Sequence, residues 1–221
     1  LRSAGSSMKK VFSILDEEPV LSNTGTITPD MQNNNAIEFD KVNFSYGRER
    51  VLHDVSFSIN KGEKIAIVGE TGAGKSTIAK LILRFYLPNE GDVNFYGESS
   101  RQDSQKWARK NIAYVPQESF LFRGSIKNNL IYSNPEGIDL EQELQEIGVL
   151  DWFERYENGL DQEVGERGAN VSAGERQFIA LLRAVLAKRE IIVFDEATAN
   201  LDIESENSIL DATDTLSLIH I

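Results

Sequence analysis

The stretch Gly69–Thr77 has the residue types and spacing of a phosphate-binding loop, G-x-x-x-x-G-K-S. Its glycines let the backbone turn tightly, so that successive N–H groups can point at one anion. Lys75 supplies a positive charge for the β- and γ-phosphates, and the Ser76 hydroxyl is suited to bind Mg²⁺. A helix that begins near Gly74 would add the positive end of its dipole. We therefore expect this loop to bind the phosphates of a nucleotide.

The residues on both sides of the loop support this prediction. The apolar run Lys64–Val68 is typical of a buried parallel strand. After the loop, four apolar residues recur with the spacing i, i+3, i+4 and i+7, which predicts one face of a helix. These residues are Ile78, Leu81, Ile82 and Phe85. An ordinary glycine-rich turn that contains Lys-Ser by chance does not account for this order of strand, loop and helix.

Two adjacent carboxylates follow a second apolar run. Ile191–Phe194 reads as a buried strand, and it ends in Asp195 and Glu196. Open α/β sheets bind ligands at the carboxyl ends of their strands. Asp195 could hold Mg²⁺ directly or through water, and Glu196 could orient and deprotonate an attacking water. An acidic pair at a strand end is weak evidence alone, and becomes strong together with the phosphate-binding loop.

Ser172 opens a third segment of interest, and two interpretations of it stay open. Ser172 and Glu175 form a capping-box pattern ahead of an apolar helical face. The apolar face consists of Phe178, Leu181, Leu182, Val185 and Leu186. In the first interpretation the serine simply caps this helix. In the second the helix N-terminus caps a phosphate, which would have to belong to another ATP because the phosphate-binding loop already has its own helix.

The rest of the sequence predicts the strands and helices around these motifs. Alternating apolar residues from Ile37 to Ile59 predict antiparallel strands, and further strands are predicted at 91–97 and 111–115. Residues 125–160 read as a helical insertion. Residues 8–15 favour a docking helix, and 20–35 a linker.

Composition narrows the functional class. The chain has 221 residues with 40% hydrophobic and 26% charged residues, which indicates a globular α/β domain. Its net charge of −12 argues against a nucleic-acid partner. It contains no cysteine, hence no disulfide or thiolate metal site. No apolar run reaches the roughly 18 residues that span a bilayer, and no signal peptide is evident.

Taken together, these motifs make residues 36–208 resemble the nucleotide-binding domain of an ATP-binding cassette (ABC) transporter. Besides the loop, called Walker A in the family, the chain has a Q-loop at Val115–Glu118, a signature at Val171–Glu175, and Walker B with D-loop at Ile191–Asp202. The resemblance implies an α/β P-loop NTPase fold with a RecA-like core, an antiparallel β-subdomain and a helical subdomain at about 118–187. Residues 1–35 would then be the end of a membrane-domain helix and a linker.

The resemblance also assigns roles. It implies ATP and Mg²⁺ as cofactors, with Tyr46 stacking on adenine; the less favoured alternative is that Tyr46 is a strand aromatic in the core. The implied nucleotide-binding residues are Tyr46, Gly69, Glu70, Thr71, Gly72, Ala73, Gly74, Lys75, Ser76, Thr77, Gln117, Ser172 and Gly174. The implied metal ligands are Ser76, Gln117 and Asp195, and the implied catalytic residues are Glu196, Lys75 and Gln117.

Two stretches resemble the exporter branch of the family. Glu163–Gly168 is similar to the X-loop, which touches the membrane domain in that branch. Ser6–Val20 is similar to the junction that follows the last transmembrane helix. The resemblance implies a transmembrane domain of the same or a partner chain, and a second nucleotide-binding domain in a homo- or heterodimer. The protein would work at the cytoplasmic face of the cell (inner) membrane, powering export by ATP-driven dimerisation.

Two other functions are weighed. One is a soluble ABC ATPase acting on DNA or ribosomes, which usually carries two cassettes or a coiled-coil insertion and a basic surface. The other is a catalytically impaired cassette that acts as a structural switch in a heterodimer. The signature departs from Leu-Ser-Gly-Gly-Gln at Val171, Ala173 and Glu175, and Ala173 places a Cβ where the backbone must approach ATP. Intact Lys75, Asp195 and Glu196 argue against the impaired cassette.

The two ends of the sequence carry expectations of their own. The chain begins with Leu1, and we expect a fragment truncated at both ends. The exporter pattern implies a further strand and then a histidine near the γ-phosphate, for which only His220 is available. Residues 209–221 are too few for a helix, a turn, the strand and this histidine, and 216–221 resemble translated vector sequence. We therefore expect a missing sheet strand and no such role for His220.

Overall fold

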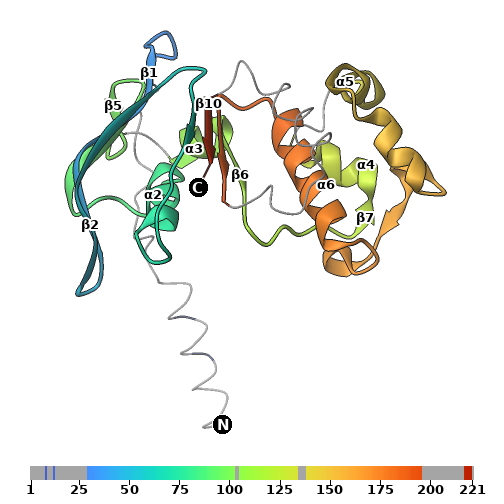
Figure 1. Ribbon diagram of the computed structural model, residues 1–221, viewed down its shortest axis with the longest axis horizontal. Helices are drawn as coiled ribbons and strands as arrows, with labels where there is room; N and C mark the ends of the chain where they lie inside the picture. Colours follow the sequence, from blue (N-terminus) through green and yellow to red (C-terminus); the bar gives the residue numbers. More distant parts are fainter. Residues whose placement is uncertain are drawn as a thin grey trace.

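The computed structural model describes residues 8, 12, 29–102, 105–133, 138–195 and 217–220. Within them the chain forms an antiparallel sheet, a parallel sheet, a two-stranded ribbon and the helices that cover them (Figure 1). Met8 and Phe12 are helical and exposed. No helix in the described ranges is both long and apolar enough to cross a bilayer.

The antiparallel sheet contains β1 (Asn35–Tyr46), β2 (Glu49–Asn60), β4 (Glu90–Phe95) and β5 (Glu98–Ser99), in the order β2-β1-β4-β5. The β1–β2 hairpin runs up the left of Figure 1. Apolar residues of β1 alternate into the core, as the sequence predicts, because successive side chains of a strand point to opposite faces. The predicted antiparallel β-subdomain is therefore confirmed.

The parallel sheet contains β3 (Lys64–Ala66), β10 (Ser217–His220), β9 (Ile191–Phe194) and β6 (Ile112–Val115), in the order β3-β10-β9-β6. All its neighbours pair in parallel. β9 is wholly buried, as predicted. The prediction of a buried strand at 64–68 is wrong: β3 has three residues at the edge of this sheet, and Val68 beyond it is 87% exposed.

β10 corrects a second expectation. Ser217–His220 forms the strand for which the sequence was expected to leave no room, and it lies between β3 and β9. Because a central strand is hydrogen-bonded on both sides, four residues suffice, and Ile219 is fully buried. The expectations for 209–216 and for the side chain of His220 fall outside the described part of the chain.

Helix α2 (Lys75–Ile82) follows the phosphate-binding loop and buries three of the four predicted face residues, Ile78, Leu81 and Ile82. The prediction for Phe85 is wrong, since this side chain is 59% exposed. The helix ends earlier because Arg84 takes a left-handed conformation (φ 52°) and the Phe85 N–H donates to the Lys80 carbonyl at 2.9 Å. This pairing is a Schellman motif, which turns the chain away from the helix axis.

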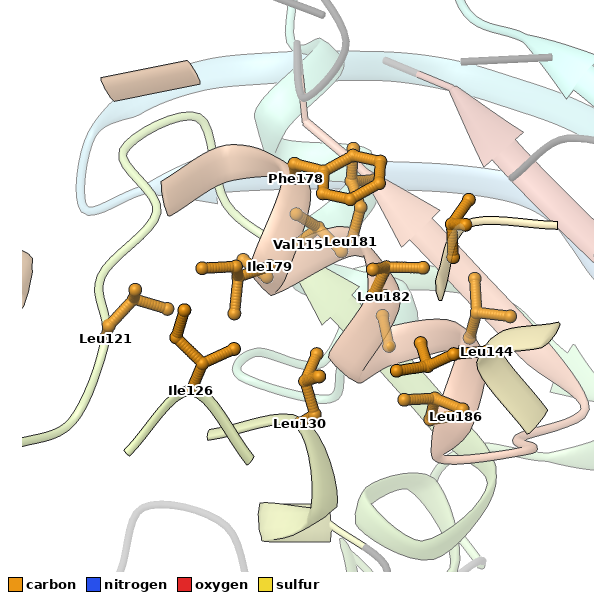
Figure 2. Close-up of a cluster of buried hydrophobic side chains, with 14 of the residues drawn as sticks. Val115, Leu121, Ile126, Leu130, Leu144, Phe178, Ile179, Leu181, Leu182 and Leu186 are labelled. Atoms are coloured by element: carbon orange, nitrogen blue, oxygen red, sulfur yellow. The ribbon is translucent and has the colours of Figure 1, made fainter. Parts of the chain in front are cut away.

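The remaining helices lie mostly to one side of the parallel sheet, where α6 (Ala173–Leu186) is central (Figure 1). All five residues of its predicted apolar face are buried. Figure 2 shows side chains of α6 interleaved with those of Leu121, Ile126, Leu130 and Leu144. The other elements are α3 (Gln105–Asn111), α4 (Ile126–Leu130), α5 (Leu140–Ile147), the 3₁₀ turns η1 (Ile131–Ser133), η2 (Leu150–Arg155), η3 (Gly159–Asp161) and η4 (Glu166–Gly168), and the ribbon of β7 (Gly124–Ser125) and β8 (Glu163–Val164).

Two hydrophobic cores meet at β9. Ile191 and Val193 belong to the core that contains α2 and the antiparallel sheet. Ile192 and Phe194 belong to the core that contains α6. Since neighbouring residues of a strand face opposite sides of the sheet, α2 and α6 pack on opposite faces of the parallel sheet.

Candidate functional site

The parallel sheet brings three predicted segments to one edge. The phosphate-binding loop follows β3, Gln117 follows β6, and Asp195 follows β9 directly. Because these strands are parallel, their carboxyl ends lie at the same edge of the sheet, which is where open α/β sheets bind ligands. Glu196 comes next in the sequence but lies outside the described residues.

The loop has the backbone conformation that its glycines predict. Gly72 and Gly74 have φ values of 86° and 92°, which other residues rarely adopt, and a Cβ on Gly74 would lie 2.7 Å from Leu52 Cδ2. The Lys75 ammonium donates to the carbonyl oxygens of Gly69 at 2.8 Å and Glu70 at 3.1 Å. The lysine charge thus lies over the loop, where an anion would meet it, and Ser76 is exposed beside it.

Asp195 is attached to β6 at two points. Its N–H donates to the Val115 carbonyl oxygen at 3.0 Å, and the Tyr114 hydroxyl donates to its Oδ2 at 3.1 Å. Burial, the Asp195 charge and this hydrogen bond raise the pKa of Tyr114 to about 12. The tyrosine therefore keeps its proton at neutral pH and acts as a donor to the carboxylate.

A cavity of about 740 Å³ opens beside Tyr46, at the end of β1. The Thr77 hydroxyl donates to the Tyr46 hydroxyl at 3.5 Å, so this ring lies next to the phosphate-binding loop. The Lys80 ammonium is 5.4 Å from the centroid of the same ring. The lining residues are Phe44, Ser45, Tyr46, Gly47, Lys80, Phe85, Tyr86, Leu87 and Asn89. Tyr46 is partly buried, since it packs against the core that contains α2 and also borders this cavity. Its stacking on adenine stays a prediction.

Ser172 caps α6 through the predicted capping box. Its hydroxyl accepts from the Glu175 N–H at 3.2 Å, and Glu175 Oε2 accepts from the Ser172 N–H at 2.8 Å. Partial burial opposes the charged form of Glu175, but hydrogen bonds from Ser172 and Tyr156 and the charge of Arg155 outweigh it and lower its pKa. The cap is confirmed. The second interpretation, that Ser172 and Gly174 meet a phosphate, stays a prediction.

A second groove of about 230 Å³ lies beside the Q-loop, between β6 and α6. Phe120 and Tyr132 on its rim are 50% and 59% exposed. Phe122 stacks on Tyr132 with centroids 4.3 Å apart, and the Arg183 guanidinium lies 5.6 Å from the Phe122 ring. This groove therefore presents an aromatic surface next to the site.

Sequence reasoning missed three residues of the site: Tyr114, Phe85 and Tyr86. Phe85 gave a misleading signal, because it continues the apolar period of α2 although the helix ends at Ile82. Tyr114 had no usable signal, since an aromatic residue in a predicted strand is ordinarily a core residue.

Comparison with known proteins fits this geometry. A family model described as ABC transporter matches residues 52–199. The chain belongs to the ABC transporter family. It is an ATP-binding domain of exporter type, with the P-loop NTPase fold of ABC ATPases, as its sequence indicated.

Relatives of this ABC domain include a putative export ATP-binding/permease protein of Rickettsia bellii, 35% identical over 213 residues, and an ATP-dependent lipid A-core flippase of Desulfotalea psychrophila, 37% identical over 212 residues. These alignments cover 93% and 95% of the chain, but only 36% and 37% of the relatives. A solved bacterial Atm1-family ABC exporter with ATP bound superposes with a TM-score of 0.89 and 34% identity, covering 100% of this chain and 40% of that one.

Proposed function

We propose that this domain binds and hydrolyses ATP with Mg²⁺ and thereby powers export of a substrate across a membrane. The observation that carries the proposal is the convergence of the phosphate-binding loop, Gln117 and Asp195 at one edge of the parallel sheet. Hydroxyl and carboxylate oxygens are ligands that Mg²⁺ prefers, so Ser76 and Asp195 fit the metal, with Gln117 beside them. Bound Mg²⁺ would neutralise charge that develops on the phosphates.

The residues of the loop would hold the triphosphate. Lys75 would exchange the carbonyl oxygens of Gly69 and Glu70 for phosphate oxygens, which carry full negative charge. The loop N–H groups from Gly69 to Thr77 would surround the phosphates, and adenine would enter the cavity beside Tyr46. Glu196 would take the proton of the attacking water.

Two domains of this kind would share their sites. α2 and α6 pack on opposite faces of the parallel sheet, so the helix that Ser172 caps is not on the same face as the helix that follows the domain's own loop. We infer that Ser172 and Gly174 complete the ATP site of a second nucleotide-binding domain, identical or not.

The second partner would be a transmembrane domain, in the same chain or another. The Rickettsia relative is described as an ATP-binding/permease protein, and it is longer than this chain. The exposed rings of Phe120 and Tyr132 beside the Q-loop and the segment Glu163–Gly168 offer the surface for this contact. Residues 1–35 would lead from the membrane domain, 36–208 would be the cassette with its helical subdomain at about 118–187, and 209–221 would follow the cassette. The domain would lie at the cytoplasmic face of the membrane.

The test measures binding and hydrolysis of ATP in parent and variants. Lys75→Ala should weaken ATP binding and abolish turnover, because the main charge facing the phosphates is lost. Glu196→Gln should keep ATP binding but lose turnover, since an amide cannot act as a base. Lys110→Ala, which removes an exposed charge at the end of α3, is the matched control.

These outcomes also separate the alternatives. Unchanged ATP binding and hydrolysis in Lys75→Ala would rule out the loop assignment. If the parent, assembled with a membrane domain as a dimer, binds ATP but does not hydrolyse it, the domain is the structural switch that Ala173 in the signature suggests.

A further inference from the structure

Tyr114 differs from Tyr46, another tyrosine at the site, because its hydroxyl donates to the carboxylate of Asp195. It is the third residue of β6 and pairs in register with Val193, two residues before Asp195. This register places the tyrosine alongside the end of β9, and its hydroxyl donates to Asp195 Oδ2 at 3.1 Å. The neighbouring Val115 carbonyl accepts from the Asp195 N–H at 3.0 Å. β6 therefore holds both the backbone and the carboxylate of Asp195.

A carboxylate held this way has its orientation set before any ligand arrives. A side chain of this kind rotates freely about its last bond in water, because that torsion has broad minima. The Tyr114 hydroxyl fixes one oxygen of Asp195, and the carboxylate keeps lone pairs on both oxygens for a metal ion or its water. Partners that orient metal ligands usually affect metal affinity strongly, because they remove the cost of ordering the ligand.

We propose that Tyr114 is a positioning residue that orients Asp195 for Mg²⁺. The inference rests on the proposed role of Asp195 as a metal ligand. Tyr114 itself contacts neither metal nor nucleotide and acts only through the carboxylate.

A matched control exists in the same chain. Tyr96 is 2% exposed, and its buried hydroxyl has no hydrogen-bond partner in the described structure. Tyr114→Phe and Tyr96→Phe each remove one oxygen and keep the ring. Their difference therefore reports the hydrogen bond to Asp195 rather than a general response of the core.

The experiment titrates Mg²⁺ against a fixed low concentration of a fluorescent ATP analogue, and repeats the binding in EDTA, with parent, Tyr114→Phe, Tyr96→Phe and Asp195→Asn. We expect Tyr114→Phe to raise the Mg²⁺ concentration for half-maximal binding about tenfold, with metal-free binding unchanged. Tyr96→Phe should match the parent in both. In hydrolysis, Tyr114→Phe should raise the KM for Mg²⁺ and keep kcat near the parental value at saturating metal.

Each other outcome overturns the inference in a distinguishable way. If Asp195→Asn shifts the Mg²⁺ titration but Tyr114→Phe does not, the proposed metal site stands and the positioning role is wrong. If neither variant shifts it, the metal role of Asp195 fails as well. If Tyr114→Phe weakens binding equally with and without metal, or Tyr96→Phe has the same effect, the hydroxyl supports the fold rather than the metal ligand.

Discussion

At the scale of single residues, two charged side chains of the site already have hydrogen-bond partners within the protein. Lys75 is held by two carbonyl oxygens of its own loop, and Asp195 by Tyr114. A nucleotide would replace the lysine's partners but leave the bond to Tyr114 intact. The residues of the site thus differ in how much they must rearrange on binding, and substitutions should differ accordingly.

Tyr46→Ala should weaken ATP binding and leave the binding of tripolyphosphate unchanged. Stacking of a base on an aromatic ring contributes about 1–3 kcal/mol in single-stranded nucleic-acid sites, and we expect a loss of this order. Tyr46→Phe keeps the ring and should retain most of the affinity. Isothermal titration with both ligands checks this, and a parent chain that binds tripolyphosphate as tightly as ATP would exclude an adenine platform.

Gly91→Ala should destabilise the fold by about 1–3 kcal/mol, because the backbone of β1 lies too close to this position for an added carbon. Its φ is +72°, and a Cβ there would lie 2.2 Å from the Lys41 carbonyl oxygen. Gly62→Ala is the matched control, with φ +76° and no heavy atom within 4 Å of the added carbon. Urea unfolding of both variants separates the clash from the backbone strain. An equal loss of unfolding free energy in the two variants would show that only the strain destabilises Gly91→Ala.

At the scale of elements, the sequence predicts best where local pattern and tertiary burial agree. α6 has both a capping box and a continuous apolar face, and β9 is apolar throughout, so both were predictable. β3 was not, because its apolar residues lie at a sheet edge that the pattern of one strand cannot reveal. Phe85 continues the helical period of α2, but the left-handed Arg84 ends the helix first. The hydrogen bond of Tyr114 depends on the register of β6 with β9, which links residues far apart in the sequence.

Glu175→Gln should reduce the loss of stability in acid. The pKa of Glu175 is lower in the folded chain than its ordinary value of 4.5, so its charged form stabilises the fold. This stabilisation is present above the unfolded pKa and is lost as the pH falls through the lower folded pKa. Glutamine keeps an acceptor for the Ser172 N–H but does not titrate.

The measurement is the free energy of unfolding near pH 7 and at about pH 3.5. We expect the difference between the two values to be smaller in Glu175→Gln than in the parent. The same difference in both proteins would show that the Glu175 carboxylate has no part in acid sensitivity.

At the scale of the whole molecule, the described residues form two cores on opposite faces of one parallel sheet. The antiparallel sheet, α2 and α3 lie on one side, and α6 with α4 and α5 lies on the other (Figure 1). The proposed phosphate and metal site forms at the sheet edge between them, while the aromatic groove lies on the α6 side. Fold class and motif order were predictable from sequence, whereas this division between the two faces required the strand order.

The alternation of β9 between the two cores makes it the slowest part of the described chain to exchange its amide hydrogens. Its backbone is hydrogen-bonded to β6 and β10 and its side chains are buried on both faces, so its amides should exchange only on global unfolding. Hydrogen-exchange mass spectrometry should find residues 191–194 protected long after the β1–β2 hairpin, and equally early exchange would contradict this. Since Asp195 follows β9 directly, loosening either core would free the carboxylate, and variants that destabilise either face should lose metal-dependent nucleotide binding as they lose protection at this strand.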